Sequence, residues 1–246
     1  MSIYFASDLH LGTPNSEDSL QREKKFIRFL ESIEHEATEI FLVGDVFDFW
    51  YEYKTAVPKG FTRLLGKIAT LVDRGIKVHY FIGNHDMWTF GYLEKELGVL
   101  MHREPIIIES FGKKILVGHG DGLGPGDHKY KMLKKIFRFP PFQWLFGWVH
   151  PDIGIGIANY FSRKSRYGKK KKEEFIAKEK EWLYVYCREY LERDASIDAF
   201  IFGHRHLALE LDIEGSHAKY INLGDWLYYD TYAQLDASGL ALKKFI

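Results

Sequence analysis

The stretch VHYFIGNHD at residues 78–86 decides the fold, because an apolar run of strand length ends there in three polar residues. Such a run, rich in β-branched and aromatic residues, is typical of a buried strand. Four more runs end in the same abrupt way. They are IYFAS before Asp8 and His10, IFLVG before Asp45, ILVG before His119, and AFIFG before His204 and His206. Five buried strands, each followed by polar residues, are therefore predicted.

Helical stretches separate the first three runs, at about residues 20–36 and 60–74. This β-α-β-α-β order predicts an α/β fold with a layered sheet. Ligands of such sheets gather at the carboxyl ends of the strands, which is where all five polar clusters fall. The polar side chains are therefore expected to meet at one edge.

Two later segments predict further strands. Residues 104–118 predict a hairpin that turns at Phe111 and Gly112, with an apolar arm on each side. The segment from Leu207 to the end of the sequence alternates short apolar runs with glycine turns, which predicts antiparallel strands.

The segment between His119 and His204 differs from the rest, because it is helical in pattern and dense in Phe and Trp. Prolines interrupt the pattern, first at Pro140 and again at Pro151. We interpret about residues 125–195 as a helical cap over the strand-end site, inserted in a single domain of residues 1–246.

Composition narrows the partners and the compartment. The 34 basic and 34 acidic residues balance, so net charge favours no polyanion and no nucleic acid is expected. The single Cys187 excludes an internal disulfide and fits a reducing compartment. The N-terminus has no signal-peptide pattern, and the longest uncharged run is too short to span a bilayer. We expect a cytoplasmic protein, with contact at a membrane surface left open.

Seven polar residues at the strand ends have side chains that bind metals. They are Asp8, His10, Asp45, Asn84, His119, His204 and His206. Alternate residues of an extended strand project to one side, so each Asp-x-His or His-x-His supplies two ligands. Seven ligands exceed the needs of one ion, whereas a bridging carboxylate holds two ions ~3.5–4 Å apart, the arrangement of phosphoryl-transfer sites. Imidazole and carboxylate without thiolate favour Mn, with Fe or Zn as alternatives, over Mg or Ca.

The motifs DLHLG, GDVFDFW, GNHD, GHGD and FGHRH, followed by NLGDW at residues 222–226, resemble those of the calcineurin-like metallophosphoesterases. The resemblance implies a four-layer α/β/β/α sandwich and a metal-dependent hydrolase of phosphoric esters or pyrophosphates. It implies one ion held by Asp8, His10, Asp45 and His206, and another held by Asp45, Asn84, His119 and His204. In that mechanism a water bridging the ions attacks phosphorus in line.

His85 and Asp86, which follow the expected ligand Asn84, are the candidate catalytic residues. The resemblance leaves His85 free to point at the phosphate, where it can donate to an oxygen or protonate the leaving group. Asp86 either supports that imidazole or serves as a cap or turn carboxylate. Asp48 and Asp121 are expected behind the metal ligands or in turns.

The length, the opening motifs and the helical insertion resemble the UDP-2,3-diacylglucosamine pyrophosphatases of lipid A biosynthesis. Those enzymes release UMP and an acylated sugar 1-phosphate. The resemblance implies a nucleotide-linked lipid as substrate, with Asn84, His85, Asp127, Ser165, Lys172 and His204 as binding residues. The basic run at residues 162–172 suits the anionic face of the cytoplasmic membrane, where each Lys or Arg contributes ~1 kcal/mol. The best-known branch has Arg after the Asn, where this chain has His85.

Two other functions remain open at this point. A phosphoesterase for a soluble nucleotide, such as a dinucleoside polyphosphate or a cyclic nucleotide, would use the same metal ligands under a polar cap. A non-catalytic scaffold would keep the fold as an interaction surface. The aromatic cap favours a lipid substrate over the first, and seven retained ligands favour an enzyme over the second. The sequence does not predict the oligomeric state.

Overall fold

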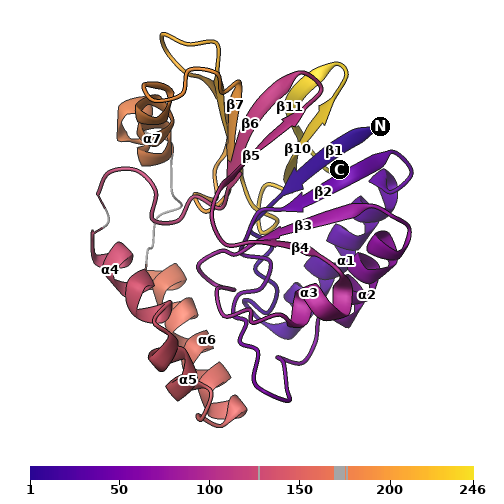
Figure 1. The fold of residues 1–246 in the computed structure, drawn as a ribbon. Helices are drawn as coiled ribbons and strands as arrows, with labels where there is room; N and C mark the ends of the chain where they lie inside the picture. The colour runs from indigo at the N-terminus through magenta and orange to yellow at the C-terminus, as the bar shows by residue number, and fades with distance from the viewer. Residues whose placement is uncertain (127, 169–174, 176) are drawn as a thin grey trace.

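The computed structural model describes residues 1–126, 128–168, 175 and 177–246, which form two sheets packed face to face (Figure 1). The first sheet contains β1 (Ser2–Ala6), β2 (Ala37–Leu42), β3 (Lys77–Phe81), β4 (Leu100–His102), β10 (Thr231–Asp236) and β11 (Gly239–Lys244). The second contains β5 (Ile106–Ser110), β6 (Lys113–Gly118), β7 (Ala199–Phe202), β8 (Ala208–Asp212) and β9 (Lys219–Leu223). The orders are β11-β10-β1-β2-β3-β4 and β5-β6-β7-β9-β8.

The helices form two outer layers and one projection (Figure 1). On the first sheet lie α1 (Ser16–Ile33), α2 (Thr62–Asp73) and α3 (Tyr92–Leu97). Beside the second sheet lie the 3-10 turn η1 (Lys178–Lys180) and α7 (Trp182–Leu191). The projection contains α4 (His128–Phe137), α5 (Pro140–Phe146) and α6 (Pro151–Gly168).

Alternation along β1 explains the layering. Ile3 and Phe5 point between the sheets, in one buried cluster with Ile201 of β7. Tyr4 points the other way, in a cluster with Phe29 of α1. Successive strand residues face opposite sides of a sheet, so a strand buried on both faces is apolar throughout. The predicted four-layer α/β/β/α sandwich is confirmed.

The first helix begins earlier than the apolar pattern indicated. The side chain of Asn15 accepts hydrogen bonds from the N–H groups of Glu17 and Asp18, which caps α1 at Ser16. Glu17 and Asp18 also place negative charge next to the positive end of the helix dipole, which stabilises the helix. The apolar face that reaches the core begins only at Phe26, which is why the pattern placed the start too late.

The inserted segment divides into two parts. Pro140 and Pro151 each begin a helix, as the interrupted pattern predicted. Helices α4 to α6 project from the sandwich, and we call them the cap (Figure 1). The last helix, α7, instead packs Leu183, Tyr184 and Cys187 into the outer layer of the second sheet. The projecting part is therefore shorter than residues 125–195.

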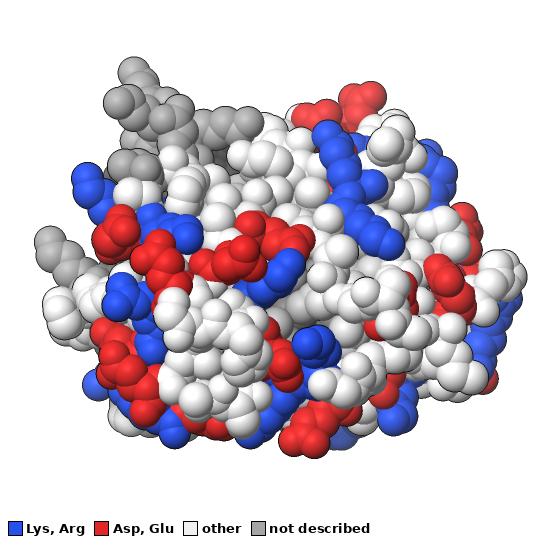
Figure 2. Space-filling view, turned by 90° about the horizontal axis from the view of Figure 1, so that it is seen from above, with Lys and Arg blue, Asp and Glu red and all other residues white. Residues whose placement is uncertain are grey.

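Strands β1 to β4 run parallel, as do β6, β7 and β9. Their carboxyl ends face the cap, so the residues that follow them converge there. On the face seen in Figure 2, basic and acidic side chains lie interspersed, in keeping with the balanced charge. No helix in the described part of the chain combines the length and apolar character that crossing a bilayer needs.

Candidate metal centre

Three residues at the ends of β1 and β7 form the first candidate ion site. The Nε2 atoms of His10 and His206 lie 3.2 Å apart. Each of them lies 3.5 Å from Asp8 Oδ1, and His10 Nε2 lies 3.7 Å from Asp45 Oδ2. Ligands with metal bonds of about 2.1 Å are about 3.0–3.4 Å apart around one ion, so these separations suit a small divalent cation.

A second group shares Asp45. Its Oδ2 lies 3.3 Å from His119 Nε2, which in turn lies 3.3 Å from Asn84 Oδ1. His204 offers a ring nitrogen to the same cluster, within 4.8 Å of the atoms of Asp45 and His119. All seven residues singled out in the sequence therefore come together, with the Asp45 carboxylate between the two groups.

Hydrogen bonds on the far side of the rings show that the group fits cations. The Nδ1 atoms of His10, His206 and His119 face Asp48 Oδ1 at 3.3 Å, Asp225 Oδ2 at 3.0 Å and the Val43 carbonyl at 2.8 Å. These acceptors place the imidazole proton on Nδ1, which leaves the Nε2 lone pairs directed inward. Asp8 Oδ1 is buried beside them without a hydrogen-bond partner. Inward lone pairs and an unsatisfied carboxylate oxygen are what metal ligands require.

Charge in the site is strongly coupled. Burial works against ionisation of Asp8, but the charge of His206 and the neighbouring His10 hold its pKa at about 2. Burial alone would lower the pKa of His119, yet the carboxylate of Asp45 raises it to about 10. His204, buried next to the charged His119, has a pKa lowered to about 4. The carboxylates thus draw positive charge into the site, which divalent ions can supply in place of protons.

Backbone strain is concentrated at these positions. Eight non-glycine residues in the described ranges have a left-handed φ, and five of them are expected ligands. These five are Asp8, His10, Asp45, His204 and His206. Each such residue costs of order 1–3 kcal/mol and persists only where its surroundings enforce it. Strain at so many positions of one cluster is typical of a functional site.

Glycines let the ligand loops approach one another. A Cβ on Gly83, just before Asn84, would overlap the Asp45 carboxylate and its backbone nitrogen. A Cβ on Gly44, just before Asp45, would overlap the His119 ring. The Gly-Asn and Gly-Asp pairs therefore serve the packing of two loops around one site.

The calcineurin-like phosphoesterase family model matches residues 1–208 of this chain. The chain belongs to the calcineurin-like phosphoesterase family. The UDP-2,3-diacylglucosamine hydrolase of Porphyromonas gingivalis is 39% identical over 253 residues, covering 98% of this chain and 96% of its own. A hydrolase of the same name from Pseudomonas aeruginosa is 28% identical and covers 97% of each chain. A solved phosphoesterase from E. coli is 14% identical, with a TM-score of 0.48, over 99% of this chain and 93% of its own.

His85 stands at the open rim of this phosphoesterase site. Its Nδ1 donates to the carbonyl of Asp48 at 2.9 Å, and its ring meets that of His10 edge to face at 4.7 Å. The side chain is 21% exposed, whereas His10 is fully buried. A ring nitrogen of His85 also lies within 4.8 Å of ligand atoms of His10 and Asp45. His85 is therefore a partly exposed neighbour of the candidate ligands His10 and Asp45.

The expectation that Asp86 supports His85 was wrong. Asp86 is fully buried and accepts hydrogen bonds from the N–H groups of Val46 and Gly83 and from the hydroxyl of Tyr80. Burial raises the pKa of its carboxyl to about 6. His85 instead donates a hydrogen bond to the backbone carbonyl of Asp48. Asp86 is the turn carboxylate of the alternative interpretation. Its hydrogen bonds connect the loop that carries Asp45 to the loop that carries Asn84.

Two residues near the site escaped the sequence analysis. Asp225 holds the Nδ1 of His206 and follows β9 in NLGDW, so its place after a strand was an available signal. Ser162 of α6 donates to Asp48 Oδ2 at 2.8 Å and lies 3.5 Å from His85 Nδ1. The side chain of Ser165, also in α6, lies outside the described part of the structure, as do Asp127 and Lys172 entirely.

Aromatic residues connect the cap to the core that carries the candidate metal ligands. Trp88 donates its indole N–H to the Phe137 carbonyl at 2.9 Å, and the Tyr51 hydroxyl donates to the Gln143 carbonyl at 2.6 Å. Both core residues follow a candidate ligand by a few positions and pack against Phe146 of α5. An apolar wall thus adjoins the polar site, a combination typical of a pocket for an amphiphilic ligand.

Proposed function

We propose that this phosphoesterase hydrolyses the pyrophosphate bond of UDP-2,3-diacylglucosamine, giving UMP and 2,3-diacylglucosamine 1-phosphate in lipid A biosynthesis. The support that carries this proposal is the nearly full-length similarity to the hydrolase of that name, which includes the cap as well as the core. We further propose that residues 1–246 form one domain and that α4 to α6 are its substrate cap.

Two divalent ions are part of the proposal, with Mn²⁺ as the first choice and Fe or Zn as alternatives. Asp8, His10, Asp45 and His206 would hold one, and Asp45, Asn84, His119 and His204 the other. When bound, the ions would supply Lewis acidity toward the phosphate oxygens and make water a stronger nucleophile. Asn84 would bind through a neutral amide oxygen, so it adds no negative charge where the pyrophosphate must bind.

His85 would act on the substrate side. Its Nδ1 hydrogen bond to Asp48 fixes the ring, and Nε2 would be the nitrogen that serves the substrate. In the hydrolysis a water oxygen bonds to phosphorus, the bridging P–O bond breaks, and a proton reaches the leaving oxygen. A protonated Nε2 at the rim can donate to a phosphate oxygen or deliver that proton.

The acyl chains would lie between core and cap. Trp88, Tyr51 and Met87 are buried there against partly exposed aromatic residues of the cap. Those cap residues are Phe137, Phe142 and Phe146. Burial of acyl chains contributes ~0.8 kcal/mol for each CH₂ that leaves water, so a wall of this kind favours a lipid over a soluble nucleotide.

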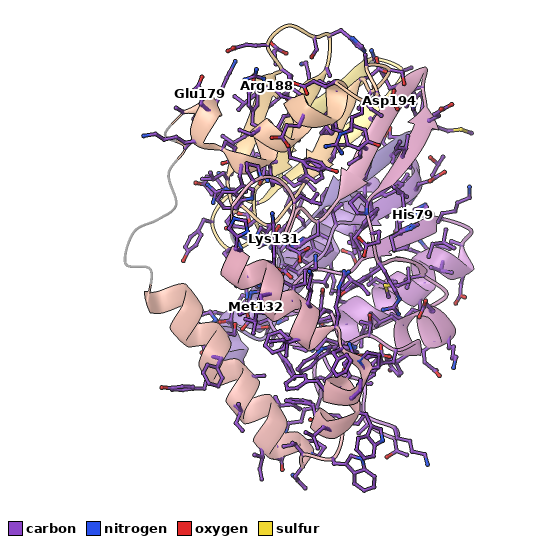
Figure 3. All side chains as sticks on the ribbon, turned by 60° about the vertical axis from the view of Figure 1, so that its left-hand side comes forward. His79, Lys131, Met132, Glu179, Arg188 and Asp194 are labelled. Carbon is purple, nitrogen blue, oxygen red and sulfur yellow. The ribbon has the colours of Figure 1, made fainter. Side chains whose placement is uncertain are left out.

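The outer side of the cap would rest on the cytoplasmic face of the membrane. Large apolar side chains that are at least 58% exposed gather on α5 and α6 or beside them. They are Phe139, Trp144, Leu145, Trp148, Ile153, Tyr160 and Phe161. Figure 3 shows how far this end of the cap projects beyond α4, where Met132 is labelled. Trp144 contacts Trp148 and Tyr160 contacts Phe161, and exposed aromatic rings of this kind prefer the bilayer interface.

Product analysis tests the proposal. The purified chain is incubated with Mn²⁺ and UDP-2,3-diacylglucosamine in mixed micelles, and nucleotide products are resolved by mass spectrometry. UMP together with the acylated sugar 1-phosphate is expected. Faster hydrolysis of a dinucleoside polyphosphate or a cyclic nucleotide would overturn the lipid assignment and leave the reaction class in place.

A further inference from the structure

The loop after β7 carries a buried arginine between two metal-ligand candidates. Arg205 stands between His204 and His206 and is 7% exposed. Both neighbours have a left-handed backbone, and the Arg205 N–H donates to the Gly203 carbonyl at 2.8 Å. The loop is therefore a tight, strained turn whose two imidazoles face the ions. A turn of this kind needs outside support to hold its shape.

The support comes from the point where the chain returns from the cap. Glu181 is 2% exposed, and both its carboxylate oxygens accept from Arg205 Nε at 3.0 Å. The guanidinium lies over the ring of Trp182, 4.0 Å from its centre. Arg205 thus contacts both Glu181, the N-cap residue of α7, and Trp182, the first residue of that helix. Figure 3 shows Glu179 and Arg188, on either side of this point, beside the second sheet.

The same short segment also contacts the loop that follows β6. Gly120 follows His119 directly, and a Cβ at Gly120 would crowd the side chain of Leu183. The Trp182 carbonyl occupies the space that a Cβ on Gly124 would need. Residues 181–183 therefore contact two of the loops that carry proposed ligands of the second ion, those of His119 and His204.

Charge makes the pairing more than a packing contact. An unpaired guanidinium next to two divalent cations would repel them in a site of low dielectric. A buried carboxylate on Arg205 offsets that repulsion and compensates the cost of burying each charge. A buried pair broken on one side leaves an uncompensated charge, so the loss of either partner should disturb the turn.

We propose that Arg205 and Glu181 are positioning residues that fix the His204–His206 turn for metal binding. The inference rests on the dinuclear site of the proposed function. Trp182 and Leu183 extend the support to the His119 loop, which links the return of the cap to both ion sites. The Arg205 side chain contacts Glu181 and Trp182, so it would act through the two histidines beside it.

Calorimetric titration of the metal-stripped full chain with Mn²⁺ tests the proposal. Arg205→Met and Glu181→Gln should each lower the affinity for at least one ion by about 10–100-fold, the range found for residues that orient ligands. Arg205→Lys keeps the charge and should recover part of the loss. Unchanged affinity in both variants, with wild type taking two ions, would overturn the positioning role.

Lys67→Met is the matched control, because Lys67 pairs with Glu34 at 2.6 Å with both side chains about equally shielded, far from the metal loops. It should lower the melting temperature without changing Mn²⁺ affinity. Glu181→Gln keeps its volume and remains informative where Arg205→Met does not fold.

Hydrogen exchange of the metal-free protein separates this inference from the metal assignment. Arg205→Met and Glu181→Gln should speed exchange of the amides at residues 203–206 relative to Lys67→Met. Unchanged exchange at these amides would overturn the positioning role of Arg205 and Glu181 even if metals bind. Uptake of fewer than two ions by the wild type would instead contradict the proposed function. Faster exchange in the two variants would then still support the positioning role.

Discussion

His10 and His206 lie 196 positions apart in the chain, yet their Nε2 atoms are 3.2 Å apart. The rings are nearly parallel, with centres 4.8 Å apart. Each is held from behind by a carboxylate, Asp48 for His10 and Asp225 for His206. Two inward lone pairs at this distance repel unless a cation lies between them, so the outer carboxylates would prepare this pair of histidines to bind one.

Asp225→Asn should therefore weaken the first ion. The amide removes the negative charge behind His206 and permits the wrong imidazole tautomer, so Mn²⁺ affinity should fall about 10–100-fold. Calorimetric titration measures it. Asp236→Asn is the control, because Asp236 also accepts a turn N–H, from Ser238, far from the site. Equal affinity in Asp225→Asn and wild type would contradict the orienting role.

Asp45→Ala should abolish turnover and stoichiometric metal binding together. Its carboxylate is shared by the two ligand groups, and its Oδ1 also accepts a hydrogen bond from the backbone N–H of His85 at 2.8 Å. Turnover of a chromogenic diester and elemental analysis of the purified protein measure the two effects. A variant that keeps both two Mn²⁺ per chain and normal turnover would rule out a bridging Asp45.

His85→Ala should lower kcat by about 10²–10⁴-fold with both ions retained, the range expected for general acid–base work. The reason is its place at the exposed rim with Nδ1 occupied by Asp48. Loss of an ion in the variant would make His85 a ligand instead. Asp86→Asn is the contrast: it should lower the melting temperature, because one amide cannot accept from all three donors that Asp86 satisfies.

The convergence of the candidate ligands was predictable because it depends on local pattern. Parallel strands are apolar throughout and end in polar residues, so Asp8, Asp45, Asn84 and His119 could be placed at strand ends from the sequence, although His119 follows a strand of the second sheet. The partner of His85 was not predictable in this way. Asp48 reaches it from a loop 37 positions away, whereas the adjacent Asp86 turns into the core.

Helix contacts were harder to predict than strand ends. Period and proline positions located α4 to α6, but helical pattern alone does not tell which layer a helix joins. Its buried face puts α7 on the second sheet, against Phe200 and Tyr220, and not in the cap. Ser162 of α6 reaches the site through its hydrogen bond to Asp48, and it stands about one turn before Ser165, whose side chain lies outside the described part of the structure.

Stability should fall between pH 6.5 and about 4 through a histidine pair outside the metal site. His79 donates from Nε2 to Glu39 and accepts at Nδ1 from His102, which keeps both rings neutral. Burial and, to a smaller extent, charge on the neighbouring His79 lower the pKa of His102 to about 4. The unfolded chain binds its proton at about pH 6.5, so this stability is present above that pH and is lost as pH falls.

His102→Gln keeps a donor toward His79 and removes one titrating group. Urea unfolding of the metal-free protein at pH 7 and pH 5 should show that the variant loses about 1 kcal/mol less than wild type over this interval, after discounting for partial exposure. The metal ligands titrate in both proteins, so their contribution cancels in the comparison. An equal loss in both would show that His102 titrates normally in the folded chain.

Trp144 and Trp148 should carry much of the contact with membranes. Their rings lie 5.7 Å apart, one helical turn from each other, and are 66% and 74% exposed. Trp144→Ser with Trp148→Ser removes two interfacial anchors, so binding to anionic vesicles should fall about tenfold or more. Vesicle co-sedimentation measures it, with turnover of a soluble chromogenic diester as the control. Neither ring contacts the metal residues, so that turnover should stay unchanged. Normal vesicle binding by the double variant would mean that the exposed face of the cap has another partner, such as a second copy of the chain.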